Sequence, residues 1–180
     1  APQQVVVVPI WRKEEQRADV LAAVERIGEA LRGRFRVKID DREDLTPGFK
    51  FNEWELRGVP LRIEIGPRDV ENRTVVLARR DVPGAAGKSV TPMDGLADAV
   101  GNTLEAIQAD MLAAATAFRD ANIHTARTYD QLKEIVTDAW ARAYWCGDPA
   151  CEAQIKEETK ASSRNIPLDQ GDAGPGTCVV

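Results

Sequence analysis

Val5-Val6-Val7-Val8-Pro9-Ile10, close to the start of the chain, is an uninterrupted apolar run rich in β-branched residues. Such a run is typical of a strand that is buried on both faces of a sheet. Glu14 to Leu31 follows with its apolar residues at helical spacing, and Gly33 ends it. Phe35 to Ile39 alternates and predicts a second strand. Together these elements predict a βαβ unit with two parallel strands.

A short helix and a third strand are predicted next. Thr46-Pro47 places a capping threonine before a proline at the first helical position, and the helix is expected to end at Gly58. Residues 59–65 alternate, so they predict a strand whose polar face carries Arg62 and Glu64.

Two further strands and a long helix complete this part of the chain. After a turn at Gly66-Pro67, residues 74–78 predict a fourth strand, and the segment around Ser89-Val90 predicts a fifth. Thr91-Pro92 is expected to cap a long helix whose apolar residues, from Leu96 to Phe118, keep one face. The fold class is therefore α/β, with a five-stranded sheet flanked by helices.

The first domain is expected to cover residues 1–121, and a second, smaller domain residues 122–180. Thr128-x-x-Gln131 is a capping box that predicts a helix, with Leu132, Ile135, Val136 and Trp140 on its inner side. The last 35 residues carry all three cysteines and a Gly/Asp/Pro-rich loop over residues 169–176. They contain too few apolar residues to fold without a stabilising cross-link, such as a metal site, or another domain to pack against.

Composition and charge limit the function classes. With 43% apolar and 29% charged residues, the 180-residue chain is typical of a globular protein, and no apolar run approaches the roughly 18 residues of a membrane span. The net charge of −5 argues against a non-specific polyanion binder. Residues 1–100 are neutral, with 17 basic and 17 acidic side chains, so a local basic surface is expected there beside an acidic tail.

The compartment and the chain ends also give expectations. The start of the chain lacks a basic, then apolar, secretory signal, and three cysteines are too few for a disulfide framework, so a reducing, cytoplasmic location is expected. The first residue is not methionine, so the chain is expected to be a fragment or a processed product.

Cys146, Cys151 and Cys178 form the sharpest local signal. Two thiolates separated by four residues and a third from a distant loop suit a structural, tetrahedral zinc site. His124, the only histidine, lies in a predicted loop and is not expected to be the fourth ligand. Three unrelated thiols, or a redox pair of Cys146 and Cys151, remain alternatives.

Two other motifs have plain interpretations. Residues 84–89, GAAGKS, resemble half of a phosphate-binding loop, but Val82 stands where that loop needs glycine, so we expect a hairpin bend with an exposed Lys88. The charge run over residues 40–44, DDRED, is typical of a solvated loop.

One group of charged residues is expected to converge on one edge of the sheet. It consists of Glu55, Arg62, Glu64, Arg68 and Asp69. A surface salt-bridge cluster explains this pattern as well as a binding site does. The sequence contains no Ser/His/Asp set, no Cys/His pair and no histidine metal motif.

Several motifs together resemble prolyl-tRNA synthetases of the archaeal/eukaryotic-like type. The resemblance runs in order over almost the whole chain and is most specific between residues 46 and 69. It rests on VVPI at 7–10, DDR at 40–42, TPGFKF at 46–51, EWELRGVPLR at 53–62, EIGPRD at 64–69, CGDPACE at 146–152 and IKEET at 155–159. The similar part of that enzyme is its C-terminal region, without the catalytic domain.

The resemblance implies a fold and a set of site residues. The fold is the class II synthetase anticodon-binding fold, a mixed five-stranded sheet flanked by helices, followed by a small α+β zinc-binding domain. The implied anticodon contacts are Glu55, Arg62, Asp69 and Lys88. The implied zinc ligands are Cys146, Cys151 and Cys178, and the fourth ligand position falls directly after Val180, so the zinc domain is expected to be truncated and zinc retention reduced.

The implied function is recognition of tRNA(Pro). Every proline anticodon ends in two guanines, whose edges offer donors to carboxylates and acceptors to Arg and Lys, so a mixed set of charges suits them. The parent enzyme would ligate proline to tRNA(Pro) with ATP and Mg²⁺ in a catalytic domain of the same polypeptide, as a homodimer, without DNA or membrane partners. The chain alone is expected to be inactive. A thiol oxidoreductase using Cys146 and Cys151, or a docking module without RNA readout, are the alternatives.

Overall fold

The computed structural model describes residues 2–168, 170 and 174–180. The chain divides into two compact units, Ala1–Leu112 and Ala113–Val180, which are described here one at a time. Part of the loop predicted at residues 169–176 lies outside the described residues. None of the helices in the described ranges is both long enough and apolar enough to cross a membrane.

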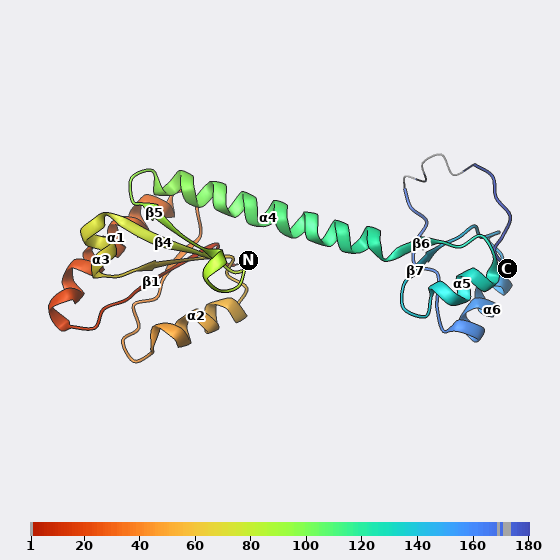
Figure 1. Ribbon diagram of the computed structural model, residues 1–180, viewed down its shortest axis with the longest axis horizontal. Coiled ribbons are helices and arrows are strands. Elements are labelled where there is room, and N and C mark those ends of the chain that lie inside the picture. Colours follow the sequence, from red (N-terminus) through yellow and green to blue (C-terminus); the bar gives the residue numbers. More distant parts are fainter. Residues whose placement is uncertain (1, 169, 171–173) are drawn as a thin grey trace. The chain divides into compact units, whose positions relative to one another are not determined.

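The first unit is built on a five-stranded mixed sheet (Figure 1). Its strands are β1 (Val5–Pro9), β2 (Val37–Ile39), β3 (Leu61–Ile65), β4 (Thr74–Arg79) and β5 (Lys88–Pro92). The strand order is β2-β1-β3-β4-β5. The pairs β1–β2 and β1–β3 are parallel, and the pairs β3–β4 and β4–β5 are antiparallel. The predicted α/β class with a mixed five-stranded sheet is confirmed.

The predicted βαβ unit is present. Every residue of β1 is buried, as its apolar run predicts. A short 3-10 helix, η1 (Glu14–Gln16), leads into α1 (Arg17–Arg32), which Gly33 ends. β2 then pairs with β1 in parallel, with Val37 opposite Val5.

Helices cover the two faces of the sheet differently (Figure 1). On one face, the odd-numbered residues of β1 and β3 pack with α1 and with the first turns of α4 (Leu96–Ala121) into the main core. On the other face, α2 (Pro47–Leu56) packs Phe51 and Trp54 against Val6 and Val8. This second face is less covered further along the sheet, where Val90 of β5 is 70% exposed.

Two predicted local features are wrong. Gly66-Pro67 is not a simple turn, because Pro67 begins a further helix, α3 (Pro67–Asn72). Thr91-Pro92 does not cap the long helix but ends β5, and α4 begins at Leu96. A proline is tolerated in β5 because β5 is an edge strand of the sheet.

The charge run at residues 40–44 is not a simple solvated loop, because Asp40 is 1% exposed. Its carboxylate accepts hydrogen bonds from Trp54 Nε1 and from Arg42 Nε and Nη2, each at 2.7 Å. Buried Lys50 donates to the Asp40 carbonyl at 3.1 Å. Burial alone would raise the pKa of Asp40, but the hydrogen bonds from Arg42 and Trp54 outweigh it and lower that pKa to about 2. These contacts lock α2 onto the end of β2.

The second unit is a small α+β arrangement. Its elements are β6 (Ile123–Thr125), α5 (Tyr129–Ile135), β7 (Trp140–Arg142) and α6 (Pro149–Thr159), with β6 and β7 parallel. Thr128 caps α5 as predicted, and its hydroxyl accepts from the Gln131 N–H at 3.3 Å. Leu132 packs with Ala126 and Val179. Trp140 is not on the inner side of α5, since that helix has ended and Trp140 is 62% exposed in β7.

Candidate nucleic-acid interface and metal centre

Four charged side chains form a continuous polar cluster on the α2 face of the sheet. Arg62 Nη1 donates to Glu55 Oε1 at 2.8 Å, and Arg62 Nε donates to Glu64 Oε1 at 3.0 Å. Lys88 Nζ donates to the other oxygen of Glu64, Oε2, at 2.8 Å. We call Glu55, Arg62, Glu64 and Lys88 the reading cluster. Three of the four predicted anticodon contacts are therefore in one network.

Strand register explains why residues far apart in sequence meet here. Arg62 lies opposite Ala78 of β4, and Ala78 lies opposite Lys88 of β5, so the three form one row across the sheet. The small Ala78 separates the two cations without covering them. Glu64 lies two residues beyond Arg62 on the same face of β3.

Gly87 fixes the bend that delivers Lys88 to this row. It is the last residue of the 3-10 helix η2 (Gly84–Gly87), directly before β5. A Cβ at Gly87 would collide with the carbonyl oxygen of Val82. The bend is therefore possible only with glycine at this position, and the predicted exposed lysine after it is confirmed.

Phe51 of α2 lies beneath both cations. The Arg62 guanidinium carbon is 4.0 Å from the ring centroid of Phe51, and Lys88 Nζ is 5.6 Å from it. Both distances allow cation–π attraction, which holds the cations on the sheet side of the cluster.

The cluster combines two cations with two carboxylates, so its formal charge is balanced. Arg62 has five N–H donors, of which Nε and one on Nη1 are used in hydrogen bonds. Glu55, with 47% of its side chain exposed, is the accessible acceptor, and Lys88, at 38%, is the accessible ammonium. The arrangement can offer both donors and acceptors to one ligand.

Asp69, the fourth predicted contact, lies in α3. Its Oδ2 accepts a hydrogen bond from the Gly66 N–H at 2.8 Å, which caps that helix. Among the described residues, no hydrogen bond or ion pair joins Asp69 to Glu55, Arg62 or Lys88. Arg68, its neighbour, is exposed.

Glu64 and Phe51 belong to this site but were not among the predicted contacts. Alternation in β3 places Glu64 on the polar face with Arg62, which is the signal that grouped it with the other charges. Its partner Lys88 comes 24 residues later, so only the strand pairing brings the two together.

The three cysteines meet in the second unit. Their sulfur atoms all lie within 4.8 Å of one another, and Cys146 and Cys151 are 3.5 Å apart. Thiolates at about 2.3 Å from a tetrahedral Zn²⁺ are about 3.8 Å from each other, so the spacing fits such an ion. The three residues thus form a candidate metal centre.

The environments of Cys151 and Cys178 shift their thiol pKa values in opposite directions. The neighbouring Cys146 thiol, with burial and Cys178, raises the pKa of Cys151 to about 12. A reactive thiol needs the opposite shift. The backbone N–H groups of Val180 and Cys146 lower the pKa of Cys178. Three thiolates this close together need a cation to balance their charge.

Tyr144 fixes the segment that carries Cys178. Its hydroxyl donates to the Gly174 carbonyl at 2.9 Å, and its own carbonyl accepts from the Val179 N–H at 3.0 Å. A Cβ at Gly176 would collide with the Tyr144 ring, so the segment lies flat against that ring.

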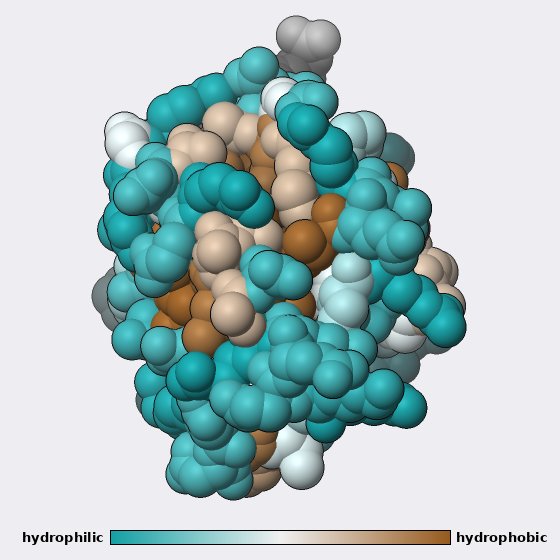
Figure 2. All heavy atoms as spheres, turned by 90° about the vertical axis from the view of Figure 1, so that its left-hand side faces the viewer, coloured by the Kyte–Doolittle hydropathy of each residue, from teal (hydrophilic) through white to brown (hydrophobic). Residues whose placement is uncertain are grey.

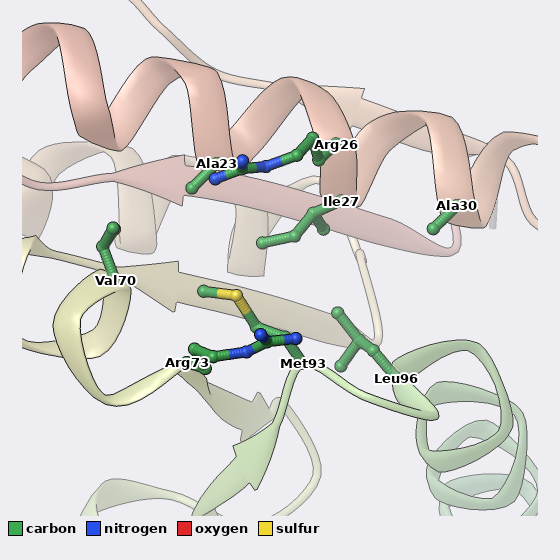
Figure 3. A pocket seen from close by; sticks show the side chains of 8 residues that line it. All are labelled: Ala23, Arg26, Ile27, Ala30, Val70, Arg73, Met93 and Leu96. Carbon is green, nitrogen blue, oxygen red and sulfur yellow. The ribbon is translucent and has the colours of Figure 1, made fainter.

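An apolar hollow lies on the opposite side of the sheet from the reading cluster. Figure 2 shows hydrophobic residues gathered among hydrophilic ones at that end of the first unit. A groove of about 420 Å³ there lies between α1, α3 and the segment before α4, with Ile27, Met93 and Leu96 among its lining and Arg26 and Arg73 beside them (Figure 3). Ile27 and Leu96 belong to the main core, so this groove and the reading cluster are on different faces.

Comparisons with known families match both units. Residues 4–102 match the family described as "Anticodon binding domain", and residues 129–180 match "Prolyl-tRNA synthetase, C-terminal". The first match includes all of the reading cluster, and the second includes all three cysteines.

Similar curated proteins carry one name. The chain is 52% identical over 179 residues to the proline–tRNA ligase of Chloroflexus aurantiacus and 52% identical to that of a Roseiflexus species, covering 99% of this chain in each case. It is 46% identical over 186 aligned residues to the chloroplastic/mitochondrial proline–tRNA ligase of Arabidopsis thaliana. The chain spans 34–37% of the length of these relatives. Since the first family match covers more than half of its residues, the chain belongs to the anticodon-binding-domain family and comprises the C-terminal anticodon-binding and C-terminal domains of prolyl-tRNA synthetase.

Proposed function

We propose that the chain recognises tRNA(Pro) by reading the two guanines of the proline anticodon with Glu55, Arg62 and Lys88. The observation that carries this proposal is the charge-balanced reading cluster on the less covered face of the sheet. A purely basic patch would bind phosphates without distinguishing bases.

Guanine presents complementary groups to such a cluster. Its O6 and N7 accept from Arg62 and Lys88, and its Watson–Crick N–H groups donate to the exposed Glu55 carboxylate. Bases in an unstacked anticodon loop expose these edges. The balanced formal charge also explains how a chain with a net charge of −5 binds RNA selectively.

Asp69 is proposed as a further base contact. One of its carboxylate oxygens caps α3, which leaves the other available as an acceptor.

In the second domain, we propose that Cys146, Cys151 and Cys178 hold a structural Zn²⁺. These thiolates fill three of the four positions of a tetrahedral ion, and the fourth ligand is expected directly after Val180. With that ligand the ion would stabilise the fold of residues 146–180 and not take part in chemistry. We propose that the boundary between the two domains lies between residues 121 and 122, directly after α4, whereas the two compact units divide inside that helix, between Leu112 and Ala113.

The whole protein is proposed to be a cytoplasmic, homodimeric proline–tRNA ligase. Its catalytic domain, elsewhere in the polypeptide, would use ATP and Mg²⁺ to join proline to tRNA(Pro), while the present domains position the tRNA. The names of the relatives support this activity.

A binding titration tests the proposed function. The chain is titrated with tRNA(Pro) and with the same tRNA in which both anticodon guanines are replaced. We expect the replacement to weaken binding several-fold or more, since each lost bidentate base contact costs about 1–3 kcal/mol. Equal binding of the two RNAs would favour a docking module without base readout.

A further inference from the structure

Glu64 is among the least accessible members of the reading cluster. Its side chain is 11% exposed, as is that of Arg62, whereas the side chain of Glu55 is 47% exposed. Its two carboxylate oxygens are divided between the two cations, Oε1 to Arg62 at 3.0 Å and Oε2 to Lys88 at 2.8 Å. Because both oxygens are occupied from within the protein, Glu64 is poorly placed to contact RNA itself.

The contacts of Glu64 determine which donors of Arg62 remain free. Arg62 Nε and Nη2 are both 3.0 Å from Glu64 Oε1, and Nη1 donates to Glu55. The hydrogen bonds use Nε and one N–H of Nη1, and Nη2 contacts Glu64 as an ion pair, so at least one N–H remains on each terminal nitrogen of the guanidinium. Two such donors match the adjacent O6 and N7 acceptors of guanine.

Glu64 also keeps two like charges together. Arg62 and Lys88 share the ring of Phe51 and repel each other without a carboxylate between them. Phe51 attracts both cations but cannot fix their direction, since it offers them no hydrogen-bond acceptor. A cation released from Glu64 becomes available to any phosphate of the RNA backbone.

We propose that Glu64 is a positioning residue that gives the cluster its guanine selectivity by holding Arg62 and Lys88 as an oriented pair. This inference rests on the proposed function. The inference assigns Glu64 to selectivity and not to affinity. Removing the Glu64 carboxylate leaves one positive charge of Arg62 and Lys88 unbalanced, and it also removes the acceptor that orients their base-reading donors.

The test compares two quantities in the full 180-residue chain carrying Glu64→Gln. The first is the selectivity ratio, which is the Kd for the guanine-replaced tRNA divided by the Kd for tRNA(Pro). The second is the slope of log affinity against log salt. We expect the ratio to fall roughly tenfold. We expect the slope to steepen by about 0.7, the value for one additional phosphate contact on single-stranded RNA.

Glu71→Gln is the matched control. Glu71 is an exposed glutamate on α3, so this variant makes the same change of charge outside the cluster. It is expected to leave the selectivity ratio unchanged.

Three further results have defined meanings. If the wild-type chain is selective and a folded Glu64→Gln variant is equally selective, the inference is overturned and the proposed function stands. A wild type without selectivity overturns the proposed function and the inference with it. If Glu64→Gln does not fold, Glu64→Asp replaces it. The shorter carboxylate keeps the charge but cannot span both cations, so the selectivity ratio is expected to fall partway, and an unchanged ratio would overturn the inference.

Discussion

At the scale of single residues, Arg62 is the centre of the proposed readout. It contacts Glu55 and Phe51, which both lie in α2, and Glu64, which lies in its own strand, β3. Only 11% of its side chain is exposed, so its direction is set before a ligand arrives. A side chain fixed in this way loses little conformational entropy on binding.

Replacing Arg62 with alanine is expected to weaken binding of tRNA(Pro) by about 1–3 kcal/mol and to relax discrimination at one guanine. Titration with tRNAs in which each guanine is replaced separately measures both effects. Arg26→Ala is the control, since it removes an exposed arginine on the other face of the sheet. Unchanged affinity and selectivity in Arg62→Ala would contradict the assigned role.

At this scale, the sequence predicts residue types better than their partners. Alternation places Arg62 and Glu64 on one face, and the bend before Lys88 is visible from its glycines. The contact between Glu64 and Lys88 depends on the register of three strands, which no local pattern specifies. Asp40 looked solvated for the same reason, because its partner Trp54 is 14 residues away.

At the scale of elements, α2 is held in place by the buried Asp40. Its carboxylate connects Arg42, which precedes the helix, to Trp54 within it. Since α2 also carries Phe51 and Glu55, this lock supports the reading cluster.

The Asp40 lock predicts a loss of stability in acid. The pKa of Asp40 in the folded chain is lowered to about 2 from its usual value of 3.8. The stability that ionised Asp40 contributes is therefore complete above about pH 4 and is lost as the pH falls through 2. The shift corresponds to about 2 kcal/mol of unfolding free energy. Denaturant unfolding between pH 5 and pH 2 measures it.

Asp40→Asn is expected to remove that part of the pH dependence, and Asp41→Asn, at an exposed neighbour, to keep it. An Asp40→Asn variant whose unfolding free energy falls with acid as steeply as that of the wild type would contradict the lock.

The bend before β5 gives a second prediction for an element. Gly87→Ala is expected to destabilise the chain by about 1–3 kcal/mol, because the added Cβ meets backbone that cannot easily move. Gly48→Ala is the control, since Gly48 is exposed in α2 with open space around it. Thermal unfolding of both variants decides whether the bend is as restricted as its geometry indicates.

Elements with a clear apolar pattern or a capping signal were predictable from the sequence, and several others were not. The apolar run of β1 and the helical spacing of α1 each contain enough residues to show a period. The helix α3 has six residues, and β6 and β7 have three each, which is too few for a period to be visible. Thr91-Pro92 has the composition of a helix start, but pairing with β4 extends the strand through it.

At the scale of the whole molecule, the chain has two units with different sources of stability. The first has an extended core of buried aliphatic residues. In the described part of the second unit, the buried apolar residues are Ala126, Leu132 and Val179, beside the cysteine cluster. The smaller core is expected to depend on the proposed metal.

Removing the metal with a chelator is therefore expected to loosen residues 146–180 and to leave the first unit folded. Hydrogen exchange resolved along the chain measures both units in one experiment. Cys178→Ser is expected to reproduce the effect of the chelator. If chelation also lowered the protection of β1 or β3 against hydrogen exchange, the stability of the first unit would depend on the metal, which would contradict this prediction.

The most direct test of base readout is the selectivity ratio measured at two salt concentrations. It compares tRNA(Pro) with the same tRNA lacking both anticodon guanines, each bound to the 180-residue chain. Because base contacts release few counterions, the ratio is predicted to be several-fold or more and to stay nearly constant while both affinities fall with salt. A ratio near one at both salt concentrations would contradict the account, because the chain would then bind RNA electrostatically without distinguishing the anticodon bases.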